Sequence, residues 1–266
     1  MEDWLGHPAV QAGAIPFIVA LAVAAFVAPT RWAFLAPVAG FIACATLAVG
    51  WSMESLNAIR KLALIGAGTA LLCVTIETAR IHRRAAEAFA LLALCAGTTW
   101  MLWRLLAQKD GGAAILAAVL AMAYVATLAA SIFRSDDPVR AASGAWVLGV
   151  GTGAVAILGA SALLGITAMG AGVAAAATLL AMVARGSAAA GRSAFLPAIA
   201  VAALAGAAAV IAAQLPWYAL LPMMLVIPIA RLAPARIGAL ERAIVASSLG
   251  ALPAAVSVAL AWYRPA

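Results

Sequence analysis

The chain is a succession of long apolar runs separated by short polar interruptions. A membrane-spanning helix needs roughly 20 consecutive apolar residues. Five runs of that length precede the longest polar interruption, and each is predicted to be a transmembrane helix: Ala9–Ala28, Ala33–Ser52, Arg60–Ala79, Ala85–Leu106 and Ala113–Phe133. The runs are continuous rather than alternating, which excludes a membrane β-barrel because barrel strands alternate apolar and polar residues.

Two of the later runs are too long for one span. The run Ala141–Ala184 would form a single helix of roughly 65 Å at 1.5 Å per residue, about twice the bilayer. We expect it to turn at the glycine cluster Gly165–Gly172. The run Ala194–Ala230 is expected to break at Gln214, Leu215 and Pro216. With a last span over Ile237–Trp262, the pattern predicts about ten spans.

The amino-acid composition also indicates that the chain lies in a lipid bilayer rather than in water. The chain has 266 residues, of which 67% are hydrophobic and 9% charged, and its mean hydropathy is +1.13. Soluble domains carry about 25% charged residues, and disordered chains are far less apolar. The sequence therefore predicts an all-α, polytopic transmembrane bundle whose main partner is the lipid bilayer. Glu2 and Asp3 replace the basic segment of a signal peptide, so the first run is expected to be a retained span.

The longest polar interruption follows the fifth run. It divides the chain into residues 1–133, a connecting loop at 134–142, and residues 143–266. Five spans in each half would place the halves in opposite orientations, an arrangement common among transporters. The halves show no convincing residue match, so ten helices without internal symmetry remain the alternative.

Basic residues are distributed unequally over the predicted loops. The odd-numbered loops hold eleven lysines and arginines, whereas the other side holds five. The positive-inside rule then places the odd loops in the cytoplasm and both termini in the periplasm. The alanine-rich composition and minimal loops favour a bacterial cytoplasmic (inner) membrane. Because the loops are too short to build a basic face, we expect no nucleic-acid partner.

Carboxylates are scarce inside the spans. All nine acidic residues lie at or near span ends, and Glu77 is the deepest. Its position three residues before Arg80 favours an interfacial ion pair, with a transported-proton or substrate carboxylate as the alternative. The absence of a mid-membrane carboxylate disfavours an ion-driven antiporter. Asp136 and Asp137, just before Pro138, are expected to cap the sixth span.

No pattern typical of a metal or cofactor site is present. His7 and His82 lie outside the spans or at their edges, and Cys44, Cys73 and Cys95 occur singly. Haem requires axial ligands within the spans, and structural zinc requires clustered cysteine or histidine residues. We therefore expect no cofactor, no metal and no catalytic residue.

Glycine spacing in the sixth and seventh spans indicates close helix contact. Gly149 and Gly153 are four residues apart, as are Ser161 and Gly165. Small residues at this spacing let helix backbones approach one another. These four positions are predicted to serve helix packing.

The ninth span is rich in prolines. Pro216, Pro222 and Pro228 are six residues apart, and each removes a backbone donor. A simple kink is the favoured interpretation, and a broken helix lining a cavity is the alternative. The residues singled out as candidates for a transport path are Gln214, Pro216, Pro222, Pro228, Gln11 and Glu77.

Three functional hypotheses follow. The first is a small permease or channel for an uncharged or amphiphilic solute. The second is a non-catalytic membrane subunit or scaffold with membrane-protein partners or further copies of the chain. The third is a membrane-embedded enzyme, which would require folding to gather Glu54, Asn57, Glu77 and His82. The lack of a visible catalytic cluster favours a protein that is not an enzyme.

Overall fold

The computed structural model describes residues 7–27, 30, 32–50, 56–79, 81–159, 161–186, 191–213 and 215–263. Every regular element in these ranges is helical. Within the described residues, eight helical segments are long and apolar enough to cross a membrane: Val10–Val27 (η1 and α2), Ala58–Thr78 (α4), Arg83–Leu106 (α5), Gly111–Phe133 (α6), Pro138–Gly159 (α7), Ala162–Arg185 (α8), Ser193–Ala212 (within η2 and α9, Arg192–Ala213) and Ala239–Trp262 (α12).

Two further apolar segments are shorter than these. The first is α3, Leu35–Val49, and the second is an interrupted segment made of α10 (Trp217–Leu220), η3 (Leu221–Leu225) and α11 (Val226–Ala230). The described residues therefore confirm the expected fold class, an all-helical bundle with helices apolar enough to span a membrane. The number of spans stays a prediction, because the two short segments alone decide between eight and ten.

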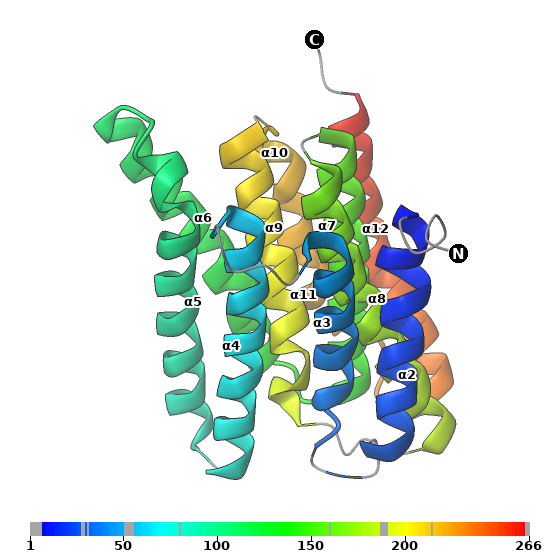
Figure 1. The fold of residues 1–266 in the computed structure, drawn as a ribbon. Coiled ribbons are helices and arrows are strands. Elements are labelled where there is room, and N and C mark those ends of the chain that lie inside the picture. Colours follow the sequence, from blue (N-terminus) through cyan, green and yellow to red (C-terminus); the bar gives the residue numbers. More distant parts are fainter. Residues whose placement is uncertain are drawn as a thin grey trace.

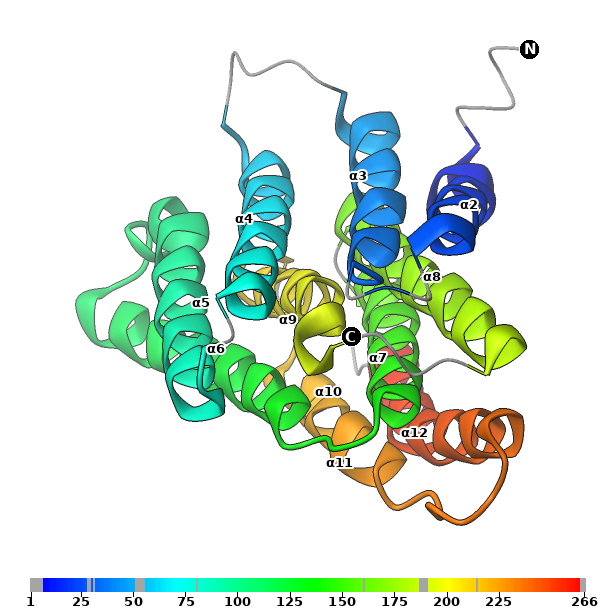
Figure 2. The same cartoon turned by 90° about the horizontal axis from the view of Figure 1, so that it is seen from below.

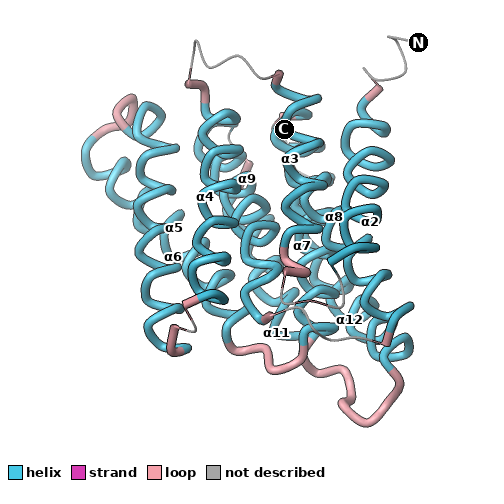
Figure 3. The backbone as a smooth tube through the Cα atoms, turned by 60° about the horizontal axis from the view of Figure 1, so that its bottom comes forward, coloured by secondary structure: helices cyan, strands magenta, loops and turns pink. Residues whose placement is uncertain are grey.

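Consecutive segments run up and down through the bundle (Figure 1). The α4–α5 and α6–α7 connections lie at the lower end of that view, and α12 ends at the upper end. The tube in Figure 3 shows the helices aligned along a common direction, with short loops at the two ends. This arrangement leaves each helix side either against another helix or open to the surrounding bilayer.

Helix α9 forms the centre of the bundle. All of the Ser193–Ala212 window is buried, and α9 contacts α4 and α6 as well as α7 and α8. Seen from below, it lies between α4, α6 and α7 (Figure 2). Its residues are mostly alanine and valine, whose short side chains let several helices approach one axis.

Helices α7 and α8 make the closest contact between helices. A Cβ atom built on Gly149 would lie 2.5 Å from Gly172 Cα, and one on Gly153 would lie 2.8 Å from the Gly165 carbonyl oxygen. Because the opposing atoms belong to the backbone, no rotamer change could make room for a side chain. Glycine at these positions is what allows the two backbones to touch.

The turn predicted at Gly165–Gly172 is wrong. These residues lie inside α8, and the break between the two helices comes earlier, because α7 ends at Gly159 and α8 begins at Ala162. Ser161 is the N-cap of α8, and its hydroxyl accepts a hydrogen bond from the Leu164 N–H at 3.5 Å. The glycines that suggested a turn serve the contact with α7 instead. The predicted break before the ninth segment is confirmed, since α9 ends at Ala213 and α10 begins at Trp217.

The connection between the two halves is shorter than the predicted loop at 134–142. Helix α7 already begins at Pro138, because Asp137 caps it: the Asp137 carboxylate accepts a hydrogen bond from the Val139 N–H at 2.9 Å. Proline at the first helical position needs no donor of its own. The expected cap is thus confirmed for Asp137.

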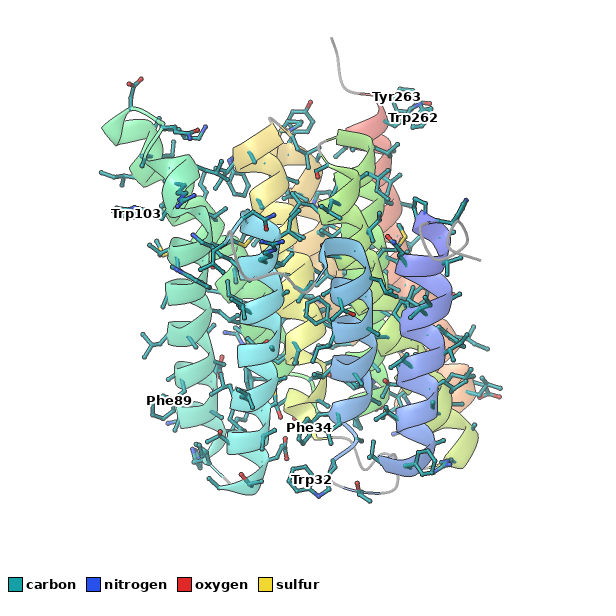
Figure 4. The ribbon with its side chains drawn as sticks, in the orientation of Figure 1. Trp32, Phe34, Phe89, Trp103, Trp262 and Tyr263 are labelled. Carbon is teal, nitrogen blue, oxygen red and sulfur yellow. The ribbon has the colours of Figure 1, made fainter. Side chains whose placement is uncertain are left out.

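Basic residues gather at one end of the bundle. By their positions in the helix order, the lower end of Figure 1 carries Arg83, Arg84, Arg134, Arg140, Arg185, Arg231, Arg236 and Arg242, and the upper end carries Arg60, Lys61, Arg104 and Lys109. Aromatic side chains lie near both ends, as Figure 4 shows for Trp32 at the bottom and Trp262 and Tyr263 at the top. This is the pattern of a bilayer-spanning protein. Which end faces the cytoplasm stays a prediction.

The two halves are surrounded differently. Helix α7, the first of the second half, packs against α8, α9 and α12. Helix α2 holds the equivalent place in the first half, and it packs against α3 and against α8 of the other half. The inverted arrangement of two halves stays a prediction, and this difference in neighbours does not favour it.

Replacing Gly149 with alanine is expected to destabilise the bundle. The added methyl group would overlap the α8 backbone, and such overpacking costs about 1–3 kcal/mol of unfolding free energy. The measurement is thermal unfolding of the purified protein in mild detergent. Gly68→Ala is the matched control, because a Cβ atom on Gly68 would meet nothing within 4 Å. Equal melting temperatures for the two variants would contradict a tight α7–α8 contact.

Candidate functional site

The candidate path residues do not come together in one place. Gln11 lies in η1, Val10–Ala14, where its side-chain amide donates a hydrogen bond to the Leu47 carbonyl oxygen at 3.5 Å. Glu77 lies at the opposite end of the bundle, near the end of α4. Gln214 falls outside the described residues. The two described polar candidates, Gln11 and Glu77, therefore do not share a site.

Glu77 is tied to the start of α9. Its carboxylate accepts a hydrogen bond from the Ser193 hydroxyl at 2.5 Å, and Gly191 leaves room for the carboxylate beside it. The Cys73 thiol donates to the Ser193 carbonyl oxygen at 3.1 Å. These contacts hold the lower end of α4 against η2. Arg80, the expected ion-pair partner of Glu77, lies outside the described residues.

The three prolines divide the ninth segment into short pieces. Pro216 is the N-cap of α10, Pro222 lies near the start of η3, and Pro228 lies inside α11. Pro222 and Pro228 lack the N–H that would serve the carbonyl four residues earlier in an α-helix. The chain responds with a 3₁₀ turn between two α-helical turns, so the segment is interrupted rather than simply kinked. It packs against α12, α7 and α6.

Five buried hydroxyls among the described residues are satisfied by their own helix. Each donates to the carbonyl three or four residues earlier, as is usual for serine and threonine in membrane helices. This holds for Thr69, Thr98, Ser131, Thr167 and Thr178. A hydroxyl satisfied in this way has no need of a further partner.

Three other buried hydroxyls differ both from these five and from Ser135, Ser143 and Ser193, which donate to oxygen atoms elsewhere in the chain. Tyr124, Thr152 and Ser257 have no hydrogen-bond partner within the described ranges. An unpaired buried polar group costs about 1–3 kcal/mol, so such groups call for a physical explanation. Two of the three lie together.

Tyr124 of α6 and Thr152 of α7 meet against the centre of α9. A Cβ atom on Gly206 would lie 3.4 Å from the Tyr124 hydroxyl oxygen and 3.3 Å from Thr152 Cγ2. The two hydroxyls lie close enough to interact with each other, but their distance or angle falls outside that of a regular hydrogen bond. Leu220, at the end of α10, is also 3.4 Å from the position of that Cβ atom. We refer to Tyr124, Thr152 and Gly206 as the hydroxyl site.

No sequence pattern marks the hydroxyl site. A lone tyrosine and a lone threonine in apolar helices are common, and their meeting depends on how α6, α7 and α9 pack. The one available signal is that Tyr124 lies in the interior of a span, whereas Tyr218 and Tyr263 lie at segment ends. Interfacial positions are the usual ones for tyrosine in membranes.

Charged residues cluster at the lower end. The Arg242 guanidinium donates to the Asp137 carboxylate at 2.6 Å and to the carbonyl oxygens of Ala235 and Ile237. Arg140 lies 3.7 Å from the same carboxylate. The side chains of Asp137 and Arg242 are only 13% and 22% exposed. Through these contacts, Arg242 connects the loop between α11 and α12 to the start of α7.

The described cysteines and His82 lie on different helices or at a helix end. The described ranges hold no group of three or more histidine, cysteine, aspartate or glutamate side chains that could bind a metal ion. Cys44, Cys73 and Cys95 are free thiols. His82 caps α5 by accepting from the Arg84 N–H at 3.4 Å, and its side chain is exposed.

Comparisons with known proteins add no functional assignment. No family model matches the chain, and neither the curated proteins nor the solved structures contain a match.

Substitutions at Asp137 should separate its two roles. Asparagine keeps a side-chain acceptor for the Val139 N–H but removes the charge opposite Arg242, whereas alanine removes both. Because loss of an N-cap costs about 1 kcal/mol, Asp137→Ala should lower the unfolding free energy by about that much more than Asp137→Asn. Thermal unfolding of both variants in detergent measures the difference.

The Arg83–Asp136 pair supplies the control. Its atoms lie 3.9 Å apart, and the two side chains are 44% and 74% exposed. Exposed pairs contribute little, so Arg83→Ala should change the unfolding free energy by less than about 0.5 kcal/mol. If Asp137→Asn and Asp137→Ala had the same melting temperature as Arg83→Ala, the charged cluster around Asp137 would have no structural role.

Proposed function

We propose that this membrane protein is a permease-like transporter for a small, uncharged solute that forms hydrogen bonds, and that it is not an enzyme. The observation that carries the proposal is the hydroxyl site, with its two unpaired hydroxyls at the centre of the bundle. We further propose that it resides in a bacterial cytoplasmic membrane with both termini in the periplasm, following the excess of arginine at one end.

The depth of the hydroxyl site supports a role in crossing the membrane. Tyr124 lies 13 residues into α6, about 20 Å along a helix of about 34 Å. Its side chain leans toward the N-terminus of α6, which brings the hydroxyl to the middle of the bilayer. A polar solute that crosses there needs hydrogen-bonding groups at that depth, and two hydroxyls can both donate and accept.

The charges of the bundle favour an uncharged solute. Buried Lys61 lies at the upper end of α4, where its ammonium group donates to the Trp100 carbonyl oxygen at 2.9 Å and lies 5.2 Å from the indole centroid. Asp137 and Glu77 lie at the lower end. In the described part of the chain, no ionisable side chain other than Tyr124 lies near the hydroxyl site, so a charged solute would lack a counter-ion there.

The neighbouring segment offers a way to open a path. Leu220, which borders the hydroxyl site, belongs to α10, and α10 leads directly into the 3₁₀ turn η3. Helices interrupted in this way often mark hinges. Movement of α10 would uncover Tyr124 and Thr152 without disturbing the tight α7–α8 contact.

Solute flux in proteoliposomes tests the proposal. We expect the wild-type protein to accelerate the entry of urea or glycerol above that of protein-free vesicles, measured as swelling by stopped-flow light scattering. Removing one stabilising hydrogen bond of about 1.4 kcal/mol should slow the protein-dependent flux about tenfold. Thr152→Val and Tyr124→Phe should each show this loss.

Thr178→Val is the matched control, because Thr178 is equally buried but donates to the Ala174 carbonyl of its own helix at 2.9 Å. It should retain wild-type flux. Equal flux through Thr152→Val and Thr178→Val, or no flux of either neutral solute through the wild-type protein, would overturn the proposal. Glutamate serves as the charged solute and should not enter.

A scaffold role is the second candidate, and one observation favours it. The first ten residues of α6, Gly111–Leu120, include no buried residue. In Figure 1 this end of the α5–α6 pair leans away from the rest of the bundle. A helical end that is uncovered in one copy of the chain offers a surface for another membrane protein or a second copy.

Native mass spectrometry after mild-detergent extraction from the host separates the two candidates. For a permease we expect the chain alone or a homo-oligomer, since transport needs no other subunit. A hetero-complex of fixed stoichiometry would instead support the scaffold role. In that case Leu116→Trp on α6 should dissociate the complex, whereas Leu71→Trp, at an exposed position of α4, should not. Leu116 is 60% exposed and Leu71 69%, so the pair is matched.

A further inference from the structure

A groove on the outer face of the bundle runs between α8 and α12. It has a volume of about 380 Å³ and opens sideways toward the bilayer. Figure 2 shows α8 and α12 on either side of α7, and α7 supplies the floor through Trp146. The walls are apolar, with Leu180 and Val183 on α8 and Leu240 and Ile244 on α12. The groove lies apart from the hydroxyl site, which faces α9.

Polar groups line the floor of this otherwise apolar groove. The Trp146 indole N–H donates to the Ser247 hydroxyl at 2.9 Å, and Ser248 lies beside it. The Ala243 carbonyl, which the Ser247 hydroxyl could use on its own helix, accepts instead from Ser143 at 3.4 Å. Among the described residues, neither Ser247 nor Ser248 donates a hydrogen bond. Two hydroxyl donors thus remain available to a molecule in the groove.

The position of the serines limits the chemistry of that molecule. Ser247 lies eight residues into α12, about 12 Å along a helix of about 36 Å. If α12 is centred in a hydrocarbon layer of about 30 Å, Ser247 lies about 9 Å inside it. Glycerol lipids hold their ester groups at the layer edge, because their headgroups are polar. A ligand for the two serines must therefore carry its acceptor on a group that enters the hydrocarbon.

The volume of the groove and the lack of charge in its lining limit the class of ligand further. The residues that line the groove are all uncharged, so the ligand must be neutral. A volume of about 380 Å³ is near the lower end for small-molecule sites, which fits one ring and the start of one tail better than two acyl chains. We propose that the groove between α8 and α12 binds a lipid-soluble quinone, whose carbonyl oxygens accept hydrogen bonds from Ser247 and Ser248.

Binding of a decyl-substituted benzoquinone to the full-length protein in nanodiscs tests the proposal. We expect saturable binding by equilibrium dialysis. Since a neutral hydrogen bond contributes about 1 kcal/mol, Ser247→Ala and Ser248→Ala should each raise the Kd about fivefold. Ala176→Phe, which places a ring in the groove, should abolish binding.

Control variants test whether the quinone binds in this groove, and competitors test whether its carbonyl groups are recognised. Ser131→Ala removes a hydroxyl that serves its own helix, and Leu252→Phe fills a second groove, between α12 and η3; both should leave the Kd unchanged. Two competitors test the carbonyl: decylbenzene, which has none, and monoolein, which carries an ester. Neither should displace the quinone. Displacement by decylbenzene would reduce the site to an apolar groove, and displacement by monoolein would assign it to ester lipids.

Two other results would overturn the proposal: unchanged binding in Ala176→Phe, or no saturable binding in the wild-type protein. Ala176→Phe is checked for folding by its thermal unfolding. If Ala176→Phe does not fold, Ser247→Ala and Ser248→Ala still test the proposal. Because urea or glycerol flux is measured separately, failure of quinone binding leaves the proposed transport role intact, and the reverse also holds.

Discussion

The direct contact between the backbones of α7 and α8 is the constraint on which the rest of the bundle depends. Inside a bilayer, burial of apolar surface does not drive helices together, because the lipid tails are as apolar as the side chains. Close van der Waals contact must supply the association instead. Gly149 against Gly172 and Gly153 against Gly165 provide that contact. Once α7 and α8 are joined, the surface they present to α9, α12, α2 and α3 is set.

The polar groups of the protein divide into two classes with different environments. Charged groups lie at the helix ends, where Asp137 pairs with Arg242 and Lys61 contacts Trp100. Hydroxyls occupy the interior, and most of the buried ones donate to an oxygen atom of the protein. Ser257 and the hydroxyls of the hydroxyl site and of the groove between α8 and α12 are exceptions, and there the chain retains hydrogen-bonding capacity. Both functional proposals depend on that unused capacity.

The sequence predicted most helices to within a few residues, because continuous apolar runs and flanking charges mark span ends directly. It predicted the N-cap at Asp137 for the same local reason. It misplaced the turn between α7 and α8, because a reversal around Ser161 needs no charge, while glycines in a membrane protein serve close contact as readily as turns. The hydroxyl site could not be predicted, since Tyr124, Thr152 and Gly206 lie on three helices and meet only through tertiary contacts.

The burial of α9 has a consequence for how the chain is assembled. Its neighbours include α4 and α6, which are synthesised well before it, and α7 and α8, which directly precede it. The inner faces of α4 and α6 therefore remain in contact with lipid until residue 213 has left the ribosome and α9 has entered between them. The first five helices consequently do not form a finished unit on their own. A chain truncated before α9 would leave the faces of α4, α6, α7 and α8 that contact α9 without their partner.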